Sequence, residues 1–400
     1  MNSIESIVNQ IEENQVNIVY FNFIDPMGTL RTKAVLSREI VRTLHISLED
    51  GVSVNGNLLP GYQDENKWFR VIPDIETFCI LPAGPKQTYR EASIMCSISN
   101  TLFDSRKILK RLMERAASMG FFPMSGMGFS YGIKNIHAFE GNGPYQLIPG
   151  SDISQFNATL VENLINAGID IESFMAYGPM HNGIELVPQG LNKSADQISL
   201  CGFIARSLGL QYSKQVTLDY PFENACPVHM SIWSGTHDRN LFFDPKGKME
   251  YSELAWSFVA GILANFDEIF AVIQATSGLA PTVPVRKTFS NTDMQCVLGT
   301  PEFFVEKNKK ARVGWSKRCV FRGIQAESNI HLVLACVYLA GLDGIERRLL
   351  PEDYSNPEYD SCSANITKKR QLLRENNLFR EFLNDHIMVA LDDMLKSQEK

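Results

Sequence analysis

The stretch VNIVYFNFIDPMGTLRTKAV, residues 16–35, shows how the chain begins to fold. Most of residues 16–24 are β-branched or aromatic, and they end at Asp25-Pro26-Met27-Gly28. Such residues suit pleated strands, whereas Pro and Gly favour turns. The stretch therefore predicts two short strands joined by a turn. Strand-like segments near 68–72 and 77–81 extend them into a small sheet-rich domain.

A helical period replaces the strand pattern from Asp104 onward. The apolar residues of 105–117 fall on one helical face, Asp104 is suited to the N-cap, and Gly120 follows the last turn. A domain boundary near 98–104 follows. Beyond it the pattern predicts a mixed α/β or α+β domain, whose segments we list here: strands near 127–133, 169–177 and 226–233, and helices near 153–167, 193–208 (ending at Gly209), 252–275, 328–340 and 378–396.

Composition and charge exclude several classes of partner. The chain has 400 residues, Lys+Arg 38 against Asp+Glu 45, and a net charge of -7. This balance provides no basic field for nucleic acid or an anionic membrane surface. The segment 254–275 carries Asn265, Asp267 and Glu268, so it predicts a buried helix and not a membrane span. The acidic N-terminus lacks a signal-peptide pattern, and the 8 cysteines form no C-x-x-C pair, which together favour a cytoplasmic protein with reduced thiols.

A series of short strings resembles, in order and spacing, the motifs of the glutamine synthetase superfamily. The family's first-hairpin motif, its "DGSS … PD-x-x-T" region, its "L-x-R-x-x-x-x-A" helix, its "H-x-S-L-W … N-x-F-x-D" strings, its "PTVNSYKR" loop and its penultimate helix are similar to the following segments: 23–28, 55–57 with 71–78, 105–117, 229–233 with 240–244, 281–283, and 335–345. The resemblance spans residues 16 to 350. It implies an α+β fold with an N-terminal β-grasp domain, residues 1–100, and a catalytic domain, residues 101–400, with a curved antiparallel sheet lined by helices. It also implies a homo-oligomeric ring.

The family reaction phosphorylates a glutamate side chain from ATP and lets ammonia displace the phosphate. The charge that develops in such a transfer is neutralised by Mg²⁺ or Mn²⁺, which prefer carboxylate oxygens. The family provides several glutamates and one histidine for these ions, and their positions in this sequence can be checked one by one.

Most of those ligand positions have lost their ligands. The Glu-x-Glu string reads Gly128-Phe129-Ser130, and neither Ala176 nor Tyr177 can replace the next glutamate. Pro227 stands at the metal histidine, and Val320 stands at the glutamate of Glu-x-Arg. Only Glu185 survives. A site without these carboxylates will not hold two divalent ions beside a triphosphate, so we expect no metal ligands and no cofactor.

The ammonia end of the family site is altered too. Asn55 occupies the position of the aspartate of "DGSS", and Met294 that of the flap glutamate. The loop after 281–283 diverges, and the "N-R-S-A-x-x-R" string is only faintly similar to 308–312.

Several polar residues could still surround a small amino-acid-like ligand. His229 and Ser231 are two apart on a predicted strand and so share a face. Arg322 is suited to gripping a carboxylate with both arms of its guanidinium. Further candidates are a substrate-binding pair and an acid–base pair: Lys287 and Asn55, and His181 and Glu185.

Three hypotheses remain open. In the first, the chain is a pseudoenzyme or scaffold that binds a small amino-acid-like ligand. In the second, it is a repurposed, metal-independent enzyme that acts on an amino acid or amine through His229, Glu185 and His181. In the third, it is a divergent amide ligase that uses ATP and Mg²⁺ through ligands recruited elsewhere.

Overall fold

The computed structural model describes residues 3–42, 44–59, 62, 68–83, 87–99, 101, 103–134, 145, 148–178, 181–218, 226–278, 286–293, 295–301, 316–325, 327–353 and 365–399. The chain forms two compact units, each assembled from separate stretches of sequence. The first unit comprises Met1–Lys107, Ser130–Leu186 and Asp196–Leu218, and the second comprises Ile108–Phe129, Val187–Ala195 and Asp219–Lys400. The expected division into residues 1–100 and 101–400 stays a prediction.

One sheet of the first unit contains the hairpin predicted from residues 16–35. The strands follow the order β2-β1-β6-β4-β3, with β5 paired to β6. Their bounds are Val16–Ile24 (β1), Leu30–Leu36 (β2), Val52–Asn55 (β3), Trp68–Pro73 (β4), Cys79–Leu81 (β5) and Arg90–Ile98 (β6). Strands β1 and β2 are antiparallel, whereas β1 and β6 are parallel. The turn depends on Gly28 at φ 82 and on Asp25, whose carboxylate accepts from the Thr29 amide at 2.9 Å.

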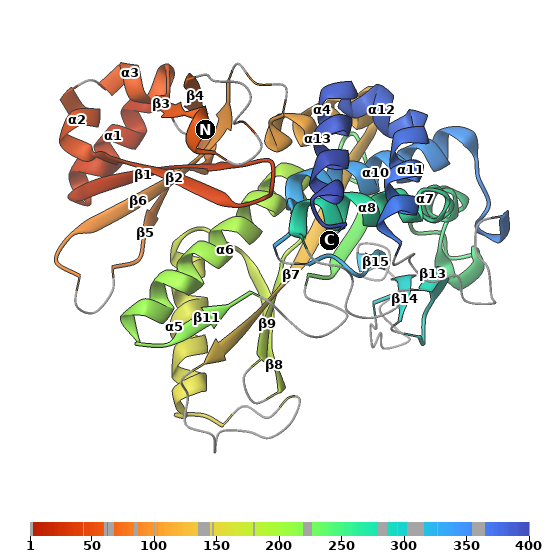
Figure 1. Cartoon of the computed structure of the whole chain (residues 1–400). Helices are drawn as coiled ribbons and strands as arrows, with labels where there is room; N and C mark the ends of the chain where they lie inside the picture. Colours follow the sequence, from red (N-terminus) through yellow and green to blue (C-terminus); the bar gives the residue numbers. More distant parts are fainter. Residues whose placement is uncertain are drawn as a thin grey trace. The chain divides into compact units, whose positions relative to one another are not determined.

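Three helices pack along this sheet, as Figure 1 shows: α1 (Ile4–Glu13), α2 (Ser37–Arg42) and α3 (Leu44–Glu49). Short 3₁₀ turns, η1 (Gly56–Leu58) and η3 (Ile75–Thr77), connect the strands. Helix α1 buries Ile7, Val8 and Ile11, which recur at helical spacing.

The first unit also contains the end of the long strand β7 (Phe121–Lys134), which pairs with β11 (Gln215–Thr217) and neighbours the hairpin of β9 (His181–Leu186) and β8 (Ile171–Gly178). Helices α5 (Asp152–Asn166) and α6 (Leu191–Gln211) accompany these strands. Helix α5 begins at Ser151, whose hydroxyl accepts from the Ser154 amide, and ends before Gly168, as the sequence predicts.

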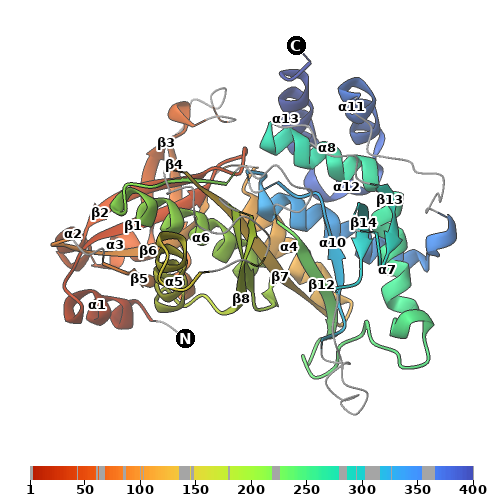
Figure 2. The same cartoon turned by 90° about the horizontal axis from the view of Figure 1, so that it is seen from below.

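The second unit contains the start of β7 within the strand order β13-β14-β15-β12-β7, and β10 also pairs with β7. The bounds are Gln189–Gly190 (β10), Val228–Ser234 (β12), Arg286–Ser290 (β13), Cys296–Gly299 (β14) and Cys319–Phe321 (β15). The helical elements are α4 (Ser105–Ser118), η4 (Lys248–Glu250), α7 (Glu253–Ala264), α8 (Phe266–Ser277), α10 (Ile330–Arg347), η5 (Pro351–Asp353), α11 (Ile366–Glu375), α12 (Asn377–Leu383) and α13 (Asp385–Lys396). Helices α8, α11 and α13 lie side by side (Figure 2).

Three predicted helices have different bounds in the structure. The helix expected over 252–275 is two helices, α7 and α8, which are bent by 62° at Asn265. The helix expected over 378–396 is likewise divided, because Asn384 has a φ of 80° and starts α13 by accepting from the Ile387 amide. Conversely, α6 continues through Gly209, where a Cβ would lie 2.8 Å from Val216 Cγ2. Gly209 is therefore a packing residue and not the end of the helix.

Among the described residues, no single helix is long and apolar enough to cross a membrane, and only the bent pair α7 and α8 passes that test by length and composition. The helix pair is mostly buried, as predicted. The seven described cysteines are free thiols, and Cys362 lies outside the described residues.

Candidate functional site

The candidate site of the second unit lies on one face of the sheet, around His229. Strand pairing places His229 opposite Gly126 of β7 and opposite Val320 of β15. Directly opposed residues project to the same face of a sheet. Alternation along β12 adds Ser231, which is opposite Met124. The predicted pair His229 and Ser231 therefore does share a face, on which His229 is partly exposed and Ser231 is buried.

The substituted ligand positions belong to the same strands. The Gly128 amide donates to the Pro227 carbonyl at 2.9 Å, so these two positions are backbone neighbours. Neither residue can offer a side-chain oxygen. Val320 is 4% exposed and presents only an aliphatic side chain beside His229. Three positions expected to bind cations are thus taken by residues that cannot ligate a metal.

The chemistry of the strands does not fit a divalent cation. Strands β7, β12, β13, β14 and β15 contain no Asp or Glu. Hard cations such as Mg²⁺ require several oxygen ligands, chiefly carboxylates. No group of three His, Cys, Asp or Glu side chains that could hold a metal ion occurs among the residues described. The residues on this face therefore disagree with the cation chemistry implied by the resemblance.

Arg322 is the charged residue of this face. The residue is 5% exposed, and its Nη1 donates to the Cys296 carbonyl at 3.1 Å. The guanidinium lies across Gly299, where a Cβ would come within 2.4 Å of Nη1. Gly299 is opposite Val320, so the guanidinium is on the same face as His229. Burial lowers the pKa of Arg322, and the attraction of Cys296 and Asp293 only partly offsets this effect.

Aromatic side chains line the same face farther along the strands. The Trp233 indole donates to the Ser231 hydroxyl at 3.0 Å, so this hydroxyl has a protein partner. Phe122, opposite Trp233, stacks on His237 with 3.6 Å between ring centroids. The face thus combines one buried cation, one imidazole and a flat aromatic surface, which suits a small organic anion better than a metal ion.

The candidate residues of the first unit lie on the β8–β9 hairpin. Alternation along β9 places His181, Gly183 and Glu185 on one face. The ring of Tyr177 covers Gly183, because a Cβ at Gly183 would lie 2.4 Å from Tyr177 Cε2 and 2.9 Å from its hydroxyl. Tyr177 thus fills space beside the surviving Glu185. Ser130 is 1% exposed, and its hydroxyl has no hydrogen-bond partner among the described residues.

The opposite face of β9 carries a buried hydrogen-bond chain. The Tyr131 hydroxyl donates to Asn157 Oδ1 at 2.7 Å, and Asn157 Nδ2 donates to Asn182 Oδ1 at 2.8 Å. All three residues are at most 1% exposed. The chain joins β7, α5 and β9, so it fixes the strand that carries His181 and Glu185.

The two other predicted residues have local roles in the structure. Asn55 Oδ1 accepts from the Asn57 amide at 3.1 Å and so caps the turn η1. The Lys287 ammonium lies 5.9 Å from the centre of the Phe266 ring. The sequence positions 281–285, 294 and 308–312 lie outside the described residues.

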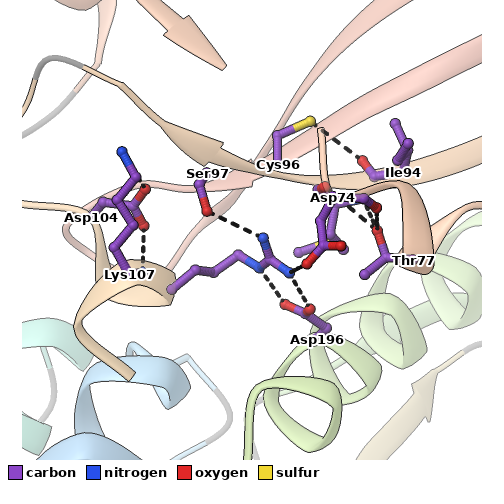
Figure 3. Close-up of polar contacts among 10 residues, drawn as sticks. Asp74, Thr77, Ile94, Cys96, Ser97, Asp104, Lys107 and Asp196 are labelled. Atoms are coloured by element: carbon purple, nitrogen blue, oxygen red, sulfur yellow. Dashed lines mark hydrogen bonds and ion pairs between the residues drawn. The ribbon is translucent and has the colours of Figure 1, made fainter. Parts of the chain in front are cut away.

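An ion cluster around Arg106 was not predicted as a group. Arg106 donates to both carboxylate oxygens of Asp196, at 2.8 and 2.7 Å, and to Asp74 at 3.0 Å. Ser97 accepts a further bond at 3.3 Å (Figure 3). Burial opposes the charge of Arg106, but Asp196 and Asp74 raise its pKa. Its position two residues after the N-cap Asp104 could have been noticed, but Asp196 is 90 residues away in the sequence.

Comparisons with known proteins agree with the fold. The family described as "Glutamine synthetase, catalytic domain" matches residues 102–390. The glutamine synthetase of Thermotoga maritima is 25% identical over 424 residues, covering 96% of this chain and 93% of the relative. That of Clostridium saccharobutylicum is 24% identical over 420 residues, covering 96% and 92%.

Two solved structures have the same fold. A crystal structure described as a novel glutamine synthase homolog has a TM-score of 0.81 at 18% identity, and the match covers 96% of this chain and 94% of that one. A complex described as GmaS with ADP has a TM-score of 0.79 at 16% identity and covers 98% and 95%. The expected α+β, glutamine synthetase-like fold is confirmed. Since the family match extends over most of its length, this chain belongs to the glutamine synthetase family.

Proposed function

We propose that this member of the family no longer joins ammonia to glutamate and instead binds a small, carboxylate-bearing, amino-acid-like ligand on the Arg322 face, as a scaffold or sensor. The observation that carries the proposal is the absence of Asp and Glu from the five strands β7, β12, β13, β14 and β15, of which β12, β14 and β15 surround Arg322. Without carboxylates, the face attracts an anion and repels a cation.

The contacts of Arg322 support a carboxylate as the ligand group. Its guanidinium is held by the Cys296 carbonyl and lies over Gly299, which fixes its plane. A pre-oriented guanidinium can form two parallel hydrogen bonds to one carboxylate. His229 is beside it on the same face and partly exposed, so the imidazole is available to a second polar group of the ligand.

The filled space near Glu185 supports loss of the ligation reaction. Tyr177 covers Gly183 on the face that also carries Glu185 and His181. A phenol ring offers one weak oxygen ligand where the family has a carboxylate. Glu185 alone provides too few oxygens for a divalent ion.

Calorimetry on the purified chain tests the proposal. We expect L-glutamate to bind without any added metal and its dimethyl ester to bind at least 10-fold more weakly, because the ester cannot pair with a guanidinium. Arg322→Met should weaken L-glutamate binding at least 10-fold, and Arg322→Lys should restore part of it. Stoichiometric Mn²⁺ binding together with ATP hydrolysis in the presence of an amino acid would overturn the proposal.

A metal-independent enzyme is the second candidate, favoured by the retained and partly exposed His229 and His181. An untargeted metabolite assay separates it from a scaffold. Turnover that is lost in both His229→Ala and Arg322→Ala would identify an enzyme. A homo-oligomeric ring is proposed for either candidate, and light scattering at a fixed protein concentration measures it.

A further inference from the structure

A cavity of about 850 Å³ lies in the second unit, between the start of α7, the end of α10 and β13. Its wall includes Trp256 and Phe289, whose rings meet edge to face with 5.0 Å between centroids. Leu254, Ile345 and Leu350 extend the apolar wall, and Leu350 is 58% exposed. The volume is in the range of pockets that bind small molecules, and such pockets are mostly apolar with a few polar groups.

Four charged side chains stand around this apolar wall. Lys248 and Glu352 are within 4.0 Å of each other and so form a weak pair. Glu253 and Arg348 also line the cavity, and both are exposed. Within the described part of the chain, neither of these two side chains makes a hydrogen bond or an ion pair. The cavity therefore presents one carboxylate and one guanidinium that are available to a ligand.

The backbone around the cavity is strained. Of the eight non-glycine residues with positive φ among those described, Met249 (φ 56), Glu250 (φ 59) and Arg348 (φ 52) lie on or directly beside its wall. Arg348 is the left-handed residue that ends α10, a position where glycine is the favoured residue. Strained residues of this kind gather at ligand sites. An arginine in a place suited to glycine indicates that its side chain is used.

We propose that this cavity binds a small zwitterion with an aromatic or branched apolar body, such as a free apolar amino acid. Arg348 pairs with the carboxylate, Glu253 pairs with the ammonium group, and the apolar body packs against Trp256 and Phe289. Opposite charges on the ligand match the two side chains, and the cavity wall buries the body. The inference goes beyond the proposed function, because none of its residues belongs to the Arg322 face.

Three related probes test the charge requirement. L-Phenylalanine carries both charges, 3-phenylpropionate only the negative one and phenethylamine only the positive one. We expect L-phenylalanine to bind at least 10-fold more tightly than either relative, as measured by calorimetry on the full chain. Equal affinity for all three would overturn the charge argument. No binding of L-phenylalanine at 20-fold the highest protein concentration used would overturn the site.

A pair of adjacent variants tests the role of Arg348 without relying on loss of folding. Arg348→Gly should weaken L-phenylalanine binding at least 10-fold while leaving the melting temperature unchanged or higher, because glycine relieves the left-handed strain. Arg347→Gly, inside the last turn of α10, should lower the melting temperature and leave the affinity within 2-fold. Unchanged affinity in Arg348→Gly would exclude the proposed pairing. Trp68→Phe, at a residue 68% exposed in the first unit, serves as a second control.

Discussion

Two buried arginines of this molecule have opposite surroundings. Arg106, in the first unit, is 4% exposed and is held by both oxygens of Asp196, by Asp74 and by Ser97. Arg322, in the second unit, is 5% exposed and lies among strands that contain no Asp or Glu. Carboxylates raise the pKa of Arg106 against the effect of burial, whereas burial lowers the pKa of Arg322.

This difference separates charge that supports the fold from charge that remains for a ligand. Bidentate pairing to Asp196 compensates for the desolvation of the Arg106 guanidinium within the protein. Desolvation of Arg322 is only partly compensated by the groups that act on its pKa. Removing each arginine should therefore have opposite effects on stability, and the following predictions test this comparison.

Arg106→Met should have the largest effect. The substitution leaves the Asp196 carboxylate, whose side chain is 8% exposed, buried without its main partner. Breaking a buried pair by removing one member costs about 3–5 kcal/mol. Urea unfolding followed by circular dichroism, at a fixed protein concentration, measures the free energy of unfolding.

The matched control is Arg115→Met, which removes a pair with Glu346 whose side chains are 33% and 42% exposed. Exposed pairs contribute about 0–1 kcal/mol. Adding Asp196→Leu to Arg106→Met should recover much of the lost stability, because the orphaned charge disappears. Losses of similar size in Arg106→Met and Arg115→Met would contradict the structural role of the Arg106 cluster.

Gly299→Ala should have the next largest effect. Its Cβ would lie 2.4 Å from Arg322 Nη1 and 2.7 Å from the Ser290 carbonyl oxygen, so both the guanidinium and the backbone must move. Overpacking of this kind costs about 1–3 kcal/mol. We also expect L-glutamate to bind at least 5-fold more weakly. An unchanged affinity would show that the orientation of Arg322 does not matter for binding.

Arg322→Met should change the free energy of unfolding little, within about 1 kcal/mol, or raise it, because the substitution removes a buried charge and keeps an apolar stem. The same urea experiment measures it beside Arg106→Met. A loss of stability as large as that of Arg106→Met would mean that Arg322 supports the fold as Arg106 does. The comparison between the two arginines would then fail.

The sequence predicted those parts of the structure that depend on local pattern. The hairpin of β1 and β2 and the start of α4 at Asp104 follow from turn and cap residues within a few positions. The breaks at Asn265 and Asn384 were missed, because the apolar pattern continues through both. A side-chain cap and a left-handed residue decide these breaks, and neither changes the hydrophobic period.

The candidate site was predicted by residue identity and not by geometry. The lost ligand positions were known from the resemblance, and strand alternation predicted that His229 and Ser231 share a face. Two contacts could not be foreseen. The Tyr177 ring covers Gly183 because β8 has an irregular register between Ala176 and Gly178. The Arg106 cluster joins residues far apart in the sequence, which only the folded chain brings together.

Divalent cations should have the smallest effect. A ligand that binds the folded state stabilises it in proportion to its affinity, so metal binding would raise the melting temperature. With Pro227 and Val320 at family ligand positions, and no Asp or Glu on the neighbouring strands, we expect Mn²⁺ or Mg²⁺ with ATP to shift the midpoint by less than about 1 °C, a fraction of the change that 1 kcal/mol produces. L-Glutamate alone should shift it more, and Arg322→Met should abolish that shift. A larger shift with Mn²⁺ than with L-glutamate would indicate that the chain binds cations through residues outside this face.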